Sequence, residues 1–169
     1  LRHPNLIDFQ SFGFDPRLGF FLVTELLNGW ELEDELRKVG VGQTLPREQV
    51  LDIVLQVCAG LGAAHEQGIV HRDLKPANIF LVPQAKEDSF LVKVFDFGIG
   101  HLLDQDFSAK LVHDNIALGT PLYMAPEQIR MEEDQIGPGS DIYALGVILF
   151  QMLTGRLPFT GRPPQARLA

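Results

Sequence analysis

The chain has one cysteine, Cys58, among its 169 residues, which excludes an internal disulfide framework or a cysteine-rich zinc site and is compatible with a reducing cytosol. Positive charge is also scarce, because 14 lysines and arginines stand against 22 acidic residues and leave a net charge of −8 at pH 7. Such a field is not attracted to a nucleic-acid backbone or to acidic lipids, so we expect neither as a partner of this segment. A basic peptide would fit it better.

Long apolar runs are missing too. The longest, Ile142 to Leu153, is too short to span a bilayer and follows Asp141, so we interpret it as a buried helix. No signal peptide is visible, and because the first residue is Leu, not Met, we expect the chain to begin inside a longer protein. We expect a cytoplasmic location for this segment, with any membrane anchor of the parent protein lying outside it.

The periodicity of the first half predicts a mixture of strands and helices. A turn-like stretch at 13–19 precedes an aromatic and β-branched run at 20–24, which indicates a hairpin. A polar helix is expected over 31–38. From 46 to 68, apolar residues recur at helical spacing and predict a long amphipathic helix. Its expected buried face consists of Val50, Ile53, Val54, Val57 and Leu61, with Cys58 as a small core residue beside them.

The second half of the sequence also predicts strands and a helix, with a loop between them. Residues 79–82 and 90–95 indicate two strands joined by a polar turn. Residues 98–119 show no clean period, which is typical of a surface loop. Asp141 then begins a helix that is apolar almost all round, as expected for the centre of a domain.

Three short motifs carry the chemistry. The run His-Arg-Asp-Leu-Lys-Pro-Ala-Asn occupies residues 71–78, Asp-Phe-Gly follows at 96–98, and Ala-Pro-Glu at 125–127. Phosphoryl transfer needs an oriented hydroxyl, neutralised phosphate charge and in-line geometry, with little covalent help from the protein. An acid, a cation and two magnesium-type ligands at this spacing match those needs.

In order and spacing, these motifs resemble the catalytic loop, DFG triplet and APE triplet of the eukaryotic-type, or Hanks-type, serine/threonine protein kinases. The resemblance covers nearly the whole chain but only the middle of a kinase domain. A glycine-rich loop and a strand lysine are absent upstream of residue 71, and the last helices of the large lobe would lie beyond Ala169. The resemblance implies a protein-kinase-like α+β fold, in which residues 1–27 form the end of the small β lobe and the hinge, and 28–169 form an incomplete helical large lobe.

The resemblance also implies catalytic roles. Asp73 would accept or orient the proton of the substrate hydroxyl, and Lys75 would contact the transferred phosphate, as in serine/threonine rather than tyrosine kinases. Asn78 would serve in catalysis and, together with Asp96, would bind Mg²⁺, whose shell the ATP phosphates would complete. Thr120 would bond to the region of Asp73 and Lys75 and help to hold the acceptor hydroxyl.

The adenine of ATP would meet the hinge. By the resemblance, Thr24 is the gatekeeper, and the Glu25 carbonyl and Leu27 amide are the hydrogen-bonding groups; the assignment allows a shift of one residue. Phe80 would form the floor of the adenine pocket, where an aliphatic residue is commoner. Glu31 has two interpretations: it contacts ribose or a basic substrate residue, or it is a solvated acid at a helix start.

Other motif residues are expected to be structural. By the resemblance, His71 would pack beneath Phe97 in a hydrophobic spine, with Phe9 as a third member. Asp141 would brace the backbone of the catalytic loop. Glu127 would pair with an arginine that this chain lacks, and the missing partner would leave a costly unpaired charge if the site is buried.

Arg72 is the expected regulatory residue. By the resemblance, it would bind a phosphate or acidic group that orders the activation loop. Ser108 is the only serine or threonine in that loop before Thr120, so it is the candidate phosphorylation site. Alternatively an acidic loop residue serves, or nothing does. The acidic candidates are Asp104, Asp106 and Asp114.

Three functions remain open. The first is transfer of the γ-phosphate of ATP, with Mg²⁺, to a serine or threonine hydroxyl of a protein substrate by the parent protein, the isolated chain being inactive. The second is a pseudokinase that acts as a scaffold, against which the intact Asp73, Asn78 and Asp96 speak. The third is a small-molecule kinase of the aminoglycoside phosphotransferase kind, which Arg72 and Lys75 disfavour.

Overall fold

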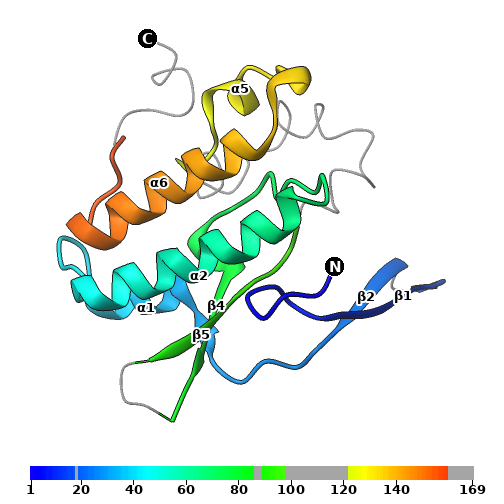
Figure 1. Ribbon diagram of the computed structural model, residues 1–169, viewed down its shortest axis with the longest axis horizontal. Coiled ribbons are helices and arrows are strands. Elements are labelled where there is room, and N and C mark those ends of the chain that lie inside the picture. Colours follow the sequence, from blue (N-terminus) through cyan, green and yellow to red (C-terminus); the bar gives the residue numbers. More distant parts are fainter. Residues whose placement is uncertain (18, 86–88, 98–121, 160–169) are drawn as a thin grey trace.

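The computed structural model describes residues 1–17, 19–85, 89–97 and 122–159, and the statements below concern those residues. Figure 1 shows a hairpin that projects from one end of the molecule, a small sheet beside it, and two long helices, α2 (Arg47–His65) and α6 (Pro138–Thr154). Helix α2 packs on the sheet and α6 packs on α2. This layering of helices on one side of antiparallel strands confirms the predicted α+β class.

The hairpin predicted from the sequence is present. Strand β1 (Phe9–Asp15) pairs antiparallel with β2 (Gly19–Thr24), and Gly19 has a φ of 83°, which a side chain rarely adopts. Asp15 Oδ1 accepts a hydrogen bond of 2.7 Å from the Arg17 amide inside the turn. The two strands form a sheet of their own, and many of their apolar side chains are exposed. These side chains are Phe9, Phe12, Phe14, Phe20, Phe21, Leu22 and Val23.

The second sheet has the order β3-β4-β5, from β3 (Trp30–Glu31), β4 (Ile79–Pro83) and β5 (Phe90–Val94), all antiparallel. Strands β4 and β5 were expected within one residue of these bounds. The sequence does not predict the two-residue β3, because Glu31 reads as the first residue of the following helix, which begins one residue later as α1 (Leu32–Val39). Gly29 allows β3 to approach β4, since a Cβ there would lie 2.0 Å from the Leu81 carbonyl oxygen.

Short helical turns carry the motif residues. The 3₁₀ turn η1 (Pro76–Asn78) ends the catalytic loop, and α5 (Pro126–Ile129) begins in the Ala-Pro-Glu motif. A second 3₁₀ turn, η3 (Glu133–Gln135), leads into α6, which ends at Gly155 with a left-handed φ of 66°. None of the helices in the described part of the chain is long and apolar enough to cross a bilayer.

The core lies between the second sheet, α2 and α6. The predicted buried face of α2 is confirmed for four residues, and Val54 is partly buried against the same cluster. The fully buried core side chains of the three elements include Val50, Ile53, Val57, Leu61, Ile79, Leu81, Val92, Val94, Ile148 and Met152.

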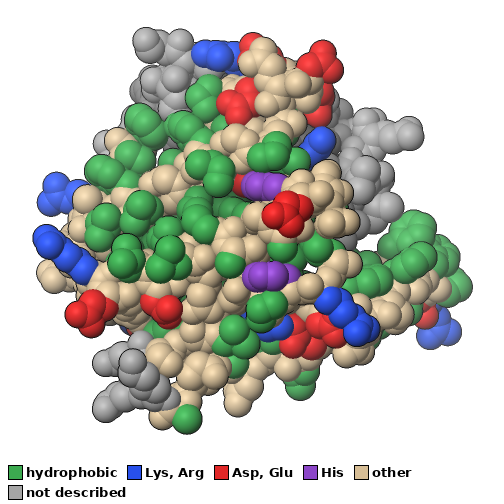
Figure 2. All heavy atoms as spheres, viewed as in Figure 1, with side chains coloured by type: hydrophobic (Ala, Val, Ile, Leu, Met, Phe, Trp, Pro, Cys, Tyr) green, Lys and Arg blue, Asp and Glu red, His purple; other side chains and the backbone are tan. Residues whose placement is uncertain are grey.

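Two expectations about burial were wrong. Cys58 is exposed rather than a core residue, because it lies one step, about 100° of helical rotation, beyond the buried Val57. Helix α6 is buried on one face only, and Ile142, Phe150 and Leu153 are exposed. Figure 2 shows apolar side chains gathered over the visible face of α2 and α6 and at the outer end of the hairpin.

Candidate active site

The catalytic loop, residues 71–78, connects the end of α2 to β4, and a buried carboxylate from α6 holds its backbone. Asp141 is 1% exposed, and its two oxygens accept hydrogen bonds of 2.9 Å from the backbone amides of His71 and Arg72. A third bond of 2.7 Å joins Asp141 Oδ2 to Nε2 of His65, at the end of α2. With three donors, the carboxylate is well satisfied despite its burial.

His71 lies completely buried under the DFG segment. Its ring centroid is 4.6 Å from that of Phe97, and its Nε2 is 2.9 Å from the Phe95 carbonyl oxygen. The other ring nitrogen, Nδ1, accepts a 3.3 Å hydrogen bond from the Asp73 amide. Burial lowers the pKa of His71, although the charge of Asp141 and the Phe95 carbonyl oppose that effect. Phe9 lines the same cavity as Phe97.

Arg72 has a strained backbone, with a φ of 66°. Its carbonyl oxygen accepts a 2.6 Å hydrogen bond from Nε2 of Gln128 in α5, which joins the Ala-Pro-Glu region to the catalytic loop. Its guanidinium lies 3.5 Å from the exposed carboxylate of Glu133 in η3. The activation-loop residues expected to meet Arg72, Ser108 among them, lie outside the described residues.

Asp73, Lys75 and Asn78 form one hydrogen-bonded cluster. Nζ of Lys75 donates to Oδ2 of Asp73 at 2.6 Å, and both side chains are 24% exposed. The amide nitrogen of Asn78 donates to the Asp73 carbonyl at 2.8 Å and to Asp73 Oδ2 at 3.4 Å. Because the nitrogen is engaged, the carboxamide oxygen is the atom of Asn78 that is left for a cation.

Asp96 follows β5 with a left-handed φ of 59°, a second strained position in a motif. The preceding residue, Phe95, donates its amide to the Asn78 carbonyl at 3.1 Å, so the two expected magnesium ligands are carried by directly bonded segments. Asp96 lines an open cavity of about 440 Å³ with Thr24 and Phe97.

The donor set fits magnesium bound together with a nucleotide. Asp96 and Asn78 offer one carboxylate and one carboxamide oxygen, the hard ligands that Mg²⁺ prefers. No group of three or more His, Cys, Asp or Glu side chains within the described ranges gathers around one point. A cation at this site would therefore need phosphate oxygens or water to complete its shell, which is the usual way Mg²⁺ is held.

The hinge follows β2. Thr24 Oγ1 donates to the Glu25 carbonyl at 3.3 Å, and Leu27 makes no backbone hydrogen bond through its amide in the described part of the chain. Leu26 between them is 99% exposed. Phe80 in β4 pairs with Glu31 in β3, so both residues belong to the β3-β4-β5 sheet, and the Phe80 ring centroid lies 6.3 Å from that of Phe95.

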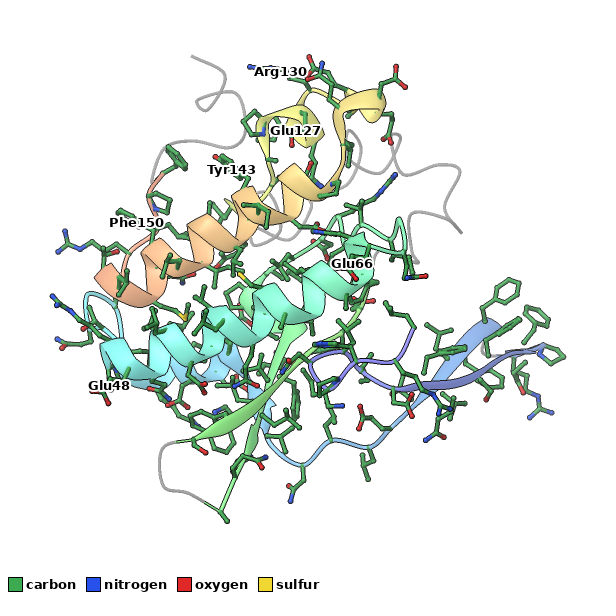
Figure 3. The ribbon with its side chains drawn as sticks, in the orientation of Figure 1. Glu48, Glu66, Glu127, Arg130, Tyr143 and Phe150 are labelled. Carbon is green, nitrogen blue, oxygen red and sulfur yellow. The ribbon has the colours of Figure 1, made fainter. Side chains whose placement is uncertain are left out.

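The remaining predicted residues give a mixed picture. Glu127 is half-buried and accepts a 2.6 Å hydrogen bond from the Ser140 hydroxyl at the start of α6, and Figure 3 shows it on α5. No arginine pairs with Glu127 in the described ranges. The sequence predicted an unpaired charge there if the site is buried, but the carboxylate has the Ser140 hydroxyl as a donor. Thr120 lies outside the described residues.

Sequence reasoning missed several residues that organise the site. His65 and Ser140 were not singled out, because each is a common residue whose partner, Asp141 or Glu127, is distant in sequence. Gln128 follows the Ala-Pro-Glu triplet directly, and its position next to a motif was the one available signal. Lys93, which pairs with the Glu25 carboxylate at 2.6 Å, reads in the sequence as an ordinary polar residue of a strand.

Comparison with known proteins agrees with this geometry. The chain matches the protein kinase domain family over residues 1–168. It is 44% identical over 171 aligned positions to the serine/threonine-protein kinase Pkn1 and 42% identical over 160 to the serine/threonine-protein kinase pkn3, both of Myxococcus xanthus. These alignments cover 98% and 94% of the chain but only 22% and 28% of the relatives.

A solved structure gives the same answer. The crystal structure of Rad53 1–466 in complex with AMP-PNP has a TM-score of 0.72 at 30% identity, and the match covers 98% of this chain and 38% of that one. The fold and the clustered motif residues define a kinase-like phosphotransferase class. The chain belongs to the protein kinase family, in its serine/threonine branch.

Proposed function

We propose that the protein carrying this chain transfers the γ-phosphoryl group of ATP to a serine or threonine hydroxyl of a protein substrate. The observation that supports it best is the cluster in which Asp73 is bonded to both Lys75 and Asn78. The bonds to Lys75 and Asn78 fix the position of the carboxylate that would receive the hydroxyl proton. The fixed geometry is the positioning that phosphoryl transfer depends on.

In the proposed reaction, Asp73 orients the acceptor hydroxyl and takes its proton as the oxygen bonds to the γ-phosphorus. The bond between that phosphorus and the bridging oxygen breaks, and ADP leaves with the electron pair. Lys75 lies beside Asp73 and would neutralise charge on the transferred group. Mg²⁺, when bound, would neutralise the phosphate charge, and Asn78 and Asp96 are the residues that would hold it.

The nucleotide itself would lie between the hinge and the catalytic loop. The Glu25 carbonyl and the Leu27 amide would bind the adenine edge, Thr24 would stand at the back of the pocket, and Phe80 would form its floor. Glu31 would face ribose or a basic substrate residue. Thr120 would hold the acceptor hydroxyl, and the Rad53 complex with an ATP analogue supports ATP as the donor. We propose the cytoplasm, where ATP is abundant, as the place of this reaction.

The test uses the full-length protein and the variant Asp73→Asn, which keeps the shape of the side chain and removes its charge. We expect phosphoryl transfer from radiolabelled ATP in the wild type and a loss of at least about 100-fold in kcat in the variant. Glu48→Gln is the matched control, because Glu48 is an exposed carboxylate at the opposite end of α2 from the catalytic loop, as Figure 3 shows. Nucleotide binding without transfer by the wild type would instead favour a pseudokinase scaffold.

A further inference from the structure

A partly buried ion pair joins the hinge to β5, outside the motifs. Lys93 of β5 is 8% exposed, and its Nζ lies 2.6 Å from Oε1 of Glu25 and 3.2 Å from the Leu6 carbonyl oxygen. A buried ammonium group is costly unless it is paired and hydrogen-bonded, and here it has both a carboxylate and a carbonyl. The pair joins the first residue after β2 to the strand that leads into Asp96.

The Glu25 carboxylate also binds the segment that precedes β1. Oε1 of Glu25 also accepts a 2.8 Å hydrogen bond from the Asp8 amide, and the Glu25 amide donates to the Asp8 carbonyl at 3.0 Å. The Ile7 amide in turn donates to the Val94 carbonyl at 3.0 Å. Three segments that are far apart in sequence, 5–8, 25 and 93–94, are therefore bonded at one point.

The electrostatics of Glu25 agree with a charged pair. Burial alone would raise the pKa of Glu25, but the hydrogen bonds from Lys93 and from the Asp8 amide, with the charge of Lys93, outweigh it and lower the pKa. The Glu25 carboxylate therefore stays ionised to a lower pH than an ordinary glutamate, and at neutral pH it carries the negative charge that faces Nζ of Lys93.

The position of this pair links two parts of the nucleotide site. Glu25 begins the hinge backbone assigned to adenine, and Lys93 lies three residues before Asp96, assigned to Mg²⁺. We infer that Lys93 is a positioning residue for the nucleotide: through the Glu25 side chain, it fixes the hinge backbone relative to the Asp96 segment. This inference rests on the proposed function for the assignment of the two sites.

Two single variants and their combination test the inference in the full-length protein. Lys93→Met keeps the approximate length of the side chain and removes its charge, and Glu25→Gln keeps the size of the side chain and removes its negative charge. We expect each to raise both the Kd of a fluorescent ATP analogue and the KM for ATP by roughly tenfold, equivalent to about 1.4 kcal/mol. We expect kcat to change by less than about twofold, because the catalytic loop is untouched. The Kd and KM of the double variant should not exceed those of the weaker-binding single variant, since both substitutions remove the same ion pair between Lys93 and Glu25.

A second measurement needs no nucleotide. Hydrogen–deuterium exchange of the peptide that spans β2 and the hinge should be faster in Lys93→Met than in wild type, because the hinge has lost its attachment to β5. Arg47→Met is the control: it too replaces a cation by methionine, but Arg47 is exposed at the start of α2, away from the hinge, so this change should leave binding and exchange unchanged.

The outcomes separate the two proposals. A wild-type protein that binds the nucleotide but transfers no phosphoryl group would overturn the proposed function, and the effect of Lys93→Met on binding and exchange would still decide the inference. The inference fails if hinge exchange, Kd and KM match those of Arg47→Met, if kcat falls while KM stays constant, or if the wild type binds no nucleotide.

Discussion

At the scale of single residues, His71 shows how much depends on one proton. Its Nδ1 accepts the Asp73 amide and its Nε2 faces the Phe95 carbonyl, so the neutral ring with its proton on Nε2 satisfies both neighbours. A second proton, on Nδ1, would meet an amide that also donates. The bond to the backbone of Asp73 would then be lost.

The pH dependence of stability follows from this geometry. Because the pKa of His71 is lowered in the folded chain, the unfolded chain takes up the proton first as pH falls. The contribution of His71 to the free energy of unfolding is therefore complete above its ordinary pKa of about 6.5 and decreases below it, by at most about 1.4 kcal/mol per pH unit. Urea unfolding of the full-length protein between about pH 7.5 and about pH 5.5 measures this slope.

The variant His71→Phe, which cannot titrate, should have a shallower slope than the wild type. His3→Gln is the control, because it removes a histidine outside the catalytic loop and should leave the slope close to that of the wild type. Equal slopes in wild type and His71→Phe would mean that other groups cause the acid sensitivity of this domain.

Single residues were also where prediction from sequence was weakest. The identities of the catalytic-loop residues were readable because their spacing is fixed along one short loop. The burial of Cys58 was misjudged, because one step around a helix separates core from solvent. The hydrogen bond from Ser140 to Glu127 could not be predicted from the sequence, because it joins two helices whose contact depends on tertiary packing.

At the scale of elements, hydrophobic periodicity predicted the helices and strands that depend mainly on local sequence. The helix expected over 46–68 is α2, which ends at His65, and Gly68 closes the turn that follows with a φ of 72°. The left-handed backbone of Arg72 and Asp96 was not predictable, because arginine seldom adopts it and aspartate, although enriched there, still adopts it at only a small fraction of positions. At Arg72, the conformation is held by bonds to Asp141 and Gln128, which come from elsewhere in the chain.

The end of α6 offers a test at this scale. Gly155 has a φ of 66°, and a Cβ there would lie 2.3 Å from the Gln43 carbonyl oxygen, whereas a Cβ at Gly146 in the middle of α6 would meet nothing within 4 Å. We expect Gly155→Ala to lower the free energy of unfolding by more than about 2 kcal/mol, through strain and a backbone clash. Gly146→Ala should raise it by about 0.5–1 kcal/mol, because alanine favours a helix interior.

Thermal unfolding of the kinase domain in the full-length protein, with both variants beside the wild type, measures the difference. Similar melting temperatures for the two variants would show that the loop at residues 42–43 moves away from α6 without cost. The packing of α6 against that loop would then be looser than the Gly155 contacts indicate.

At the scale of the whole molecule, the described residues leave much apolar surface uncovered. On the hairpin, Phe12 is 74% exposed, Phe20 67% and Phe14 61%, and Leu51 and Leu55 on α2 are each 63% exposed. Surfaces of this kind on a soluble protein usually face another part of the same protein or a partner. The fold class was predictable from the motifs, but which faces stay uncovered became clear only from the packing of the elements.

The isolated chain of residues 1–169 is therefore expected to self-associate and to transfer little or no phosphate. Its sequence has neither a glycine-rich GxGxxG loop nor a VAIK-type strand lysine, and those parts supply much of the phosphate positioning in kinases. Light scattering after size-exclusion chromatography measures association, and radiolabelled ATP measures turnover. Replacing Phe12 and Phe20 with serine should shift the chain toward monomer without restoring activity, because the two defects have separate causes. A monodisperse, monomeric chain with steady-state turnover close to that of the full-length protein would contradict both expectations, and would mean that Asp73, Lys75, Asn78 and Asp96 suffice to position the phosphates.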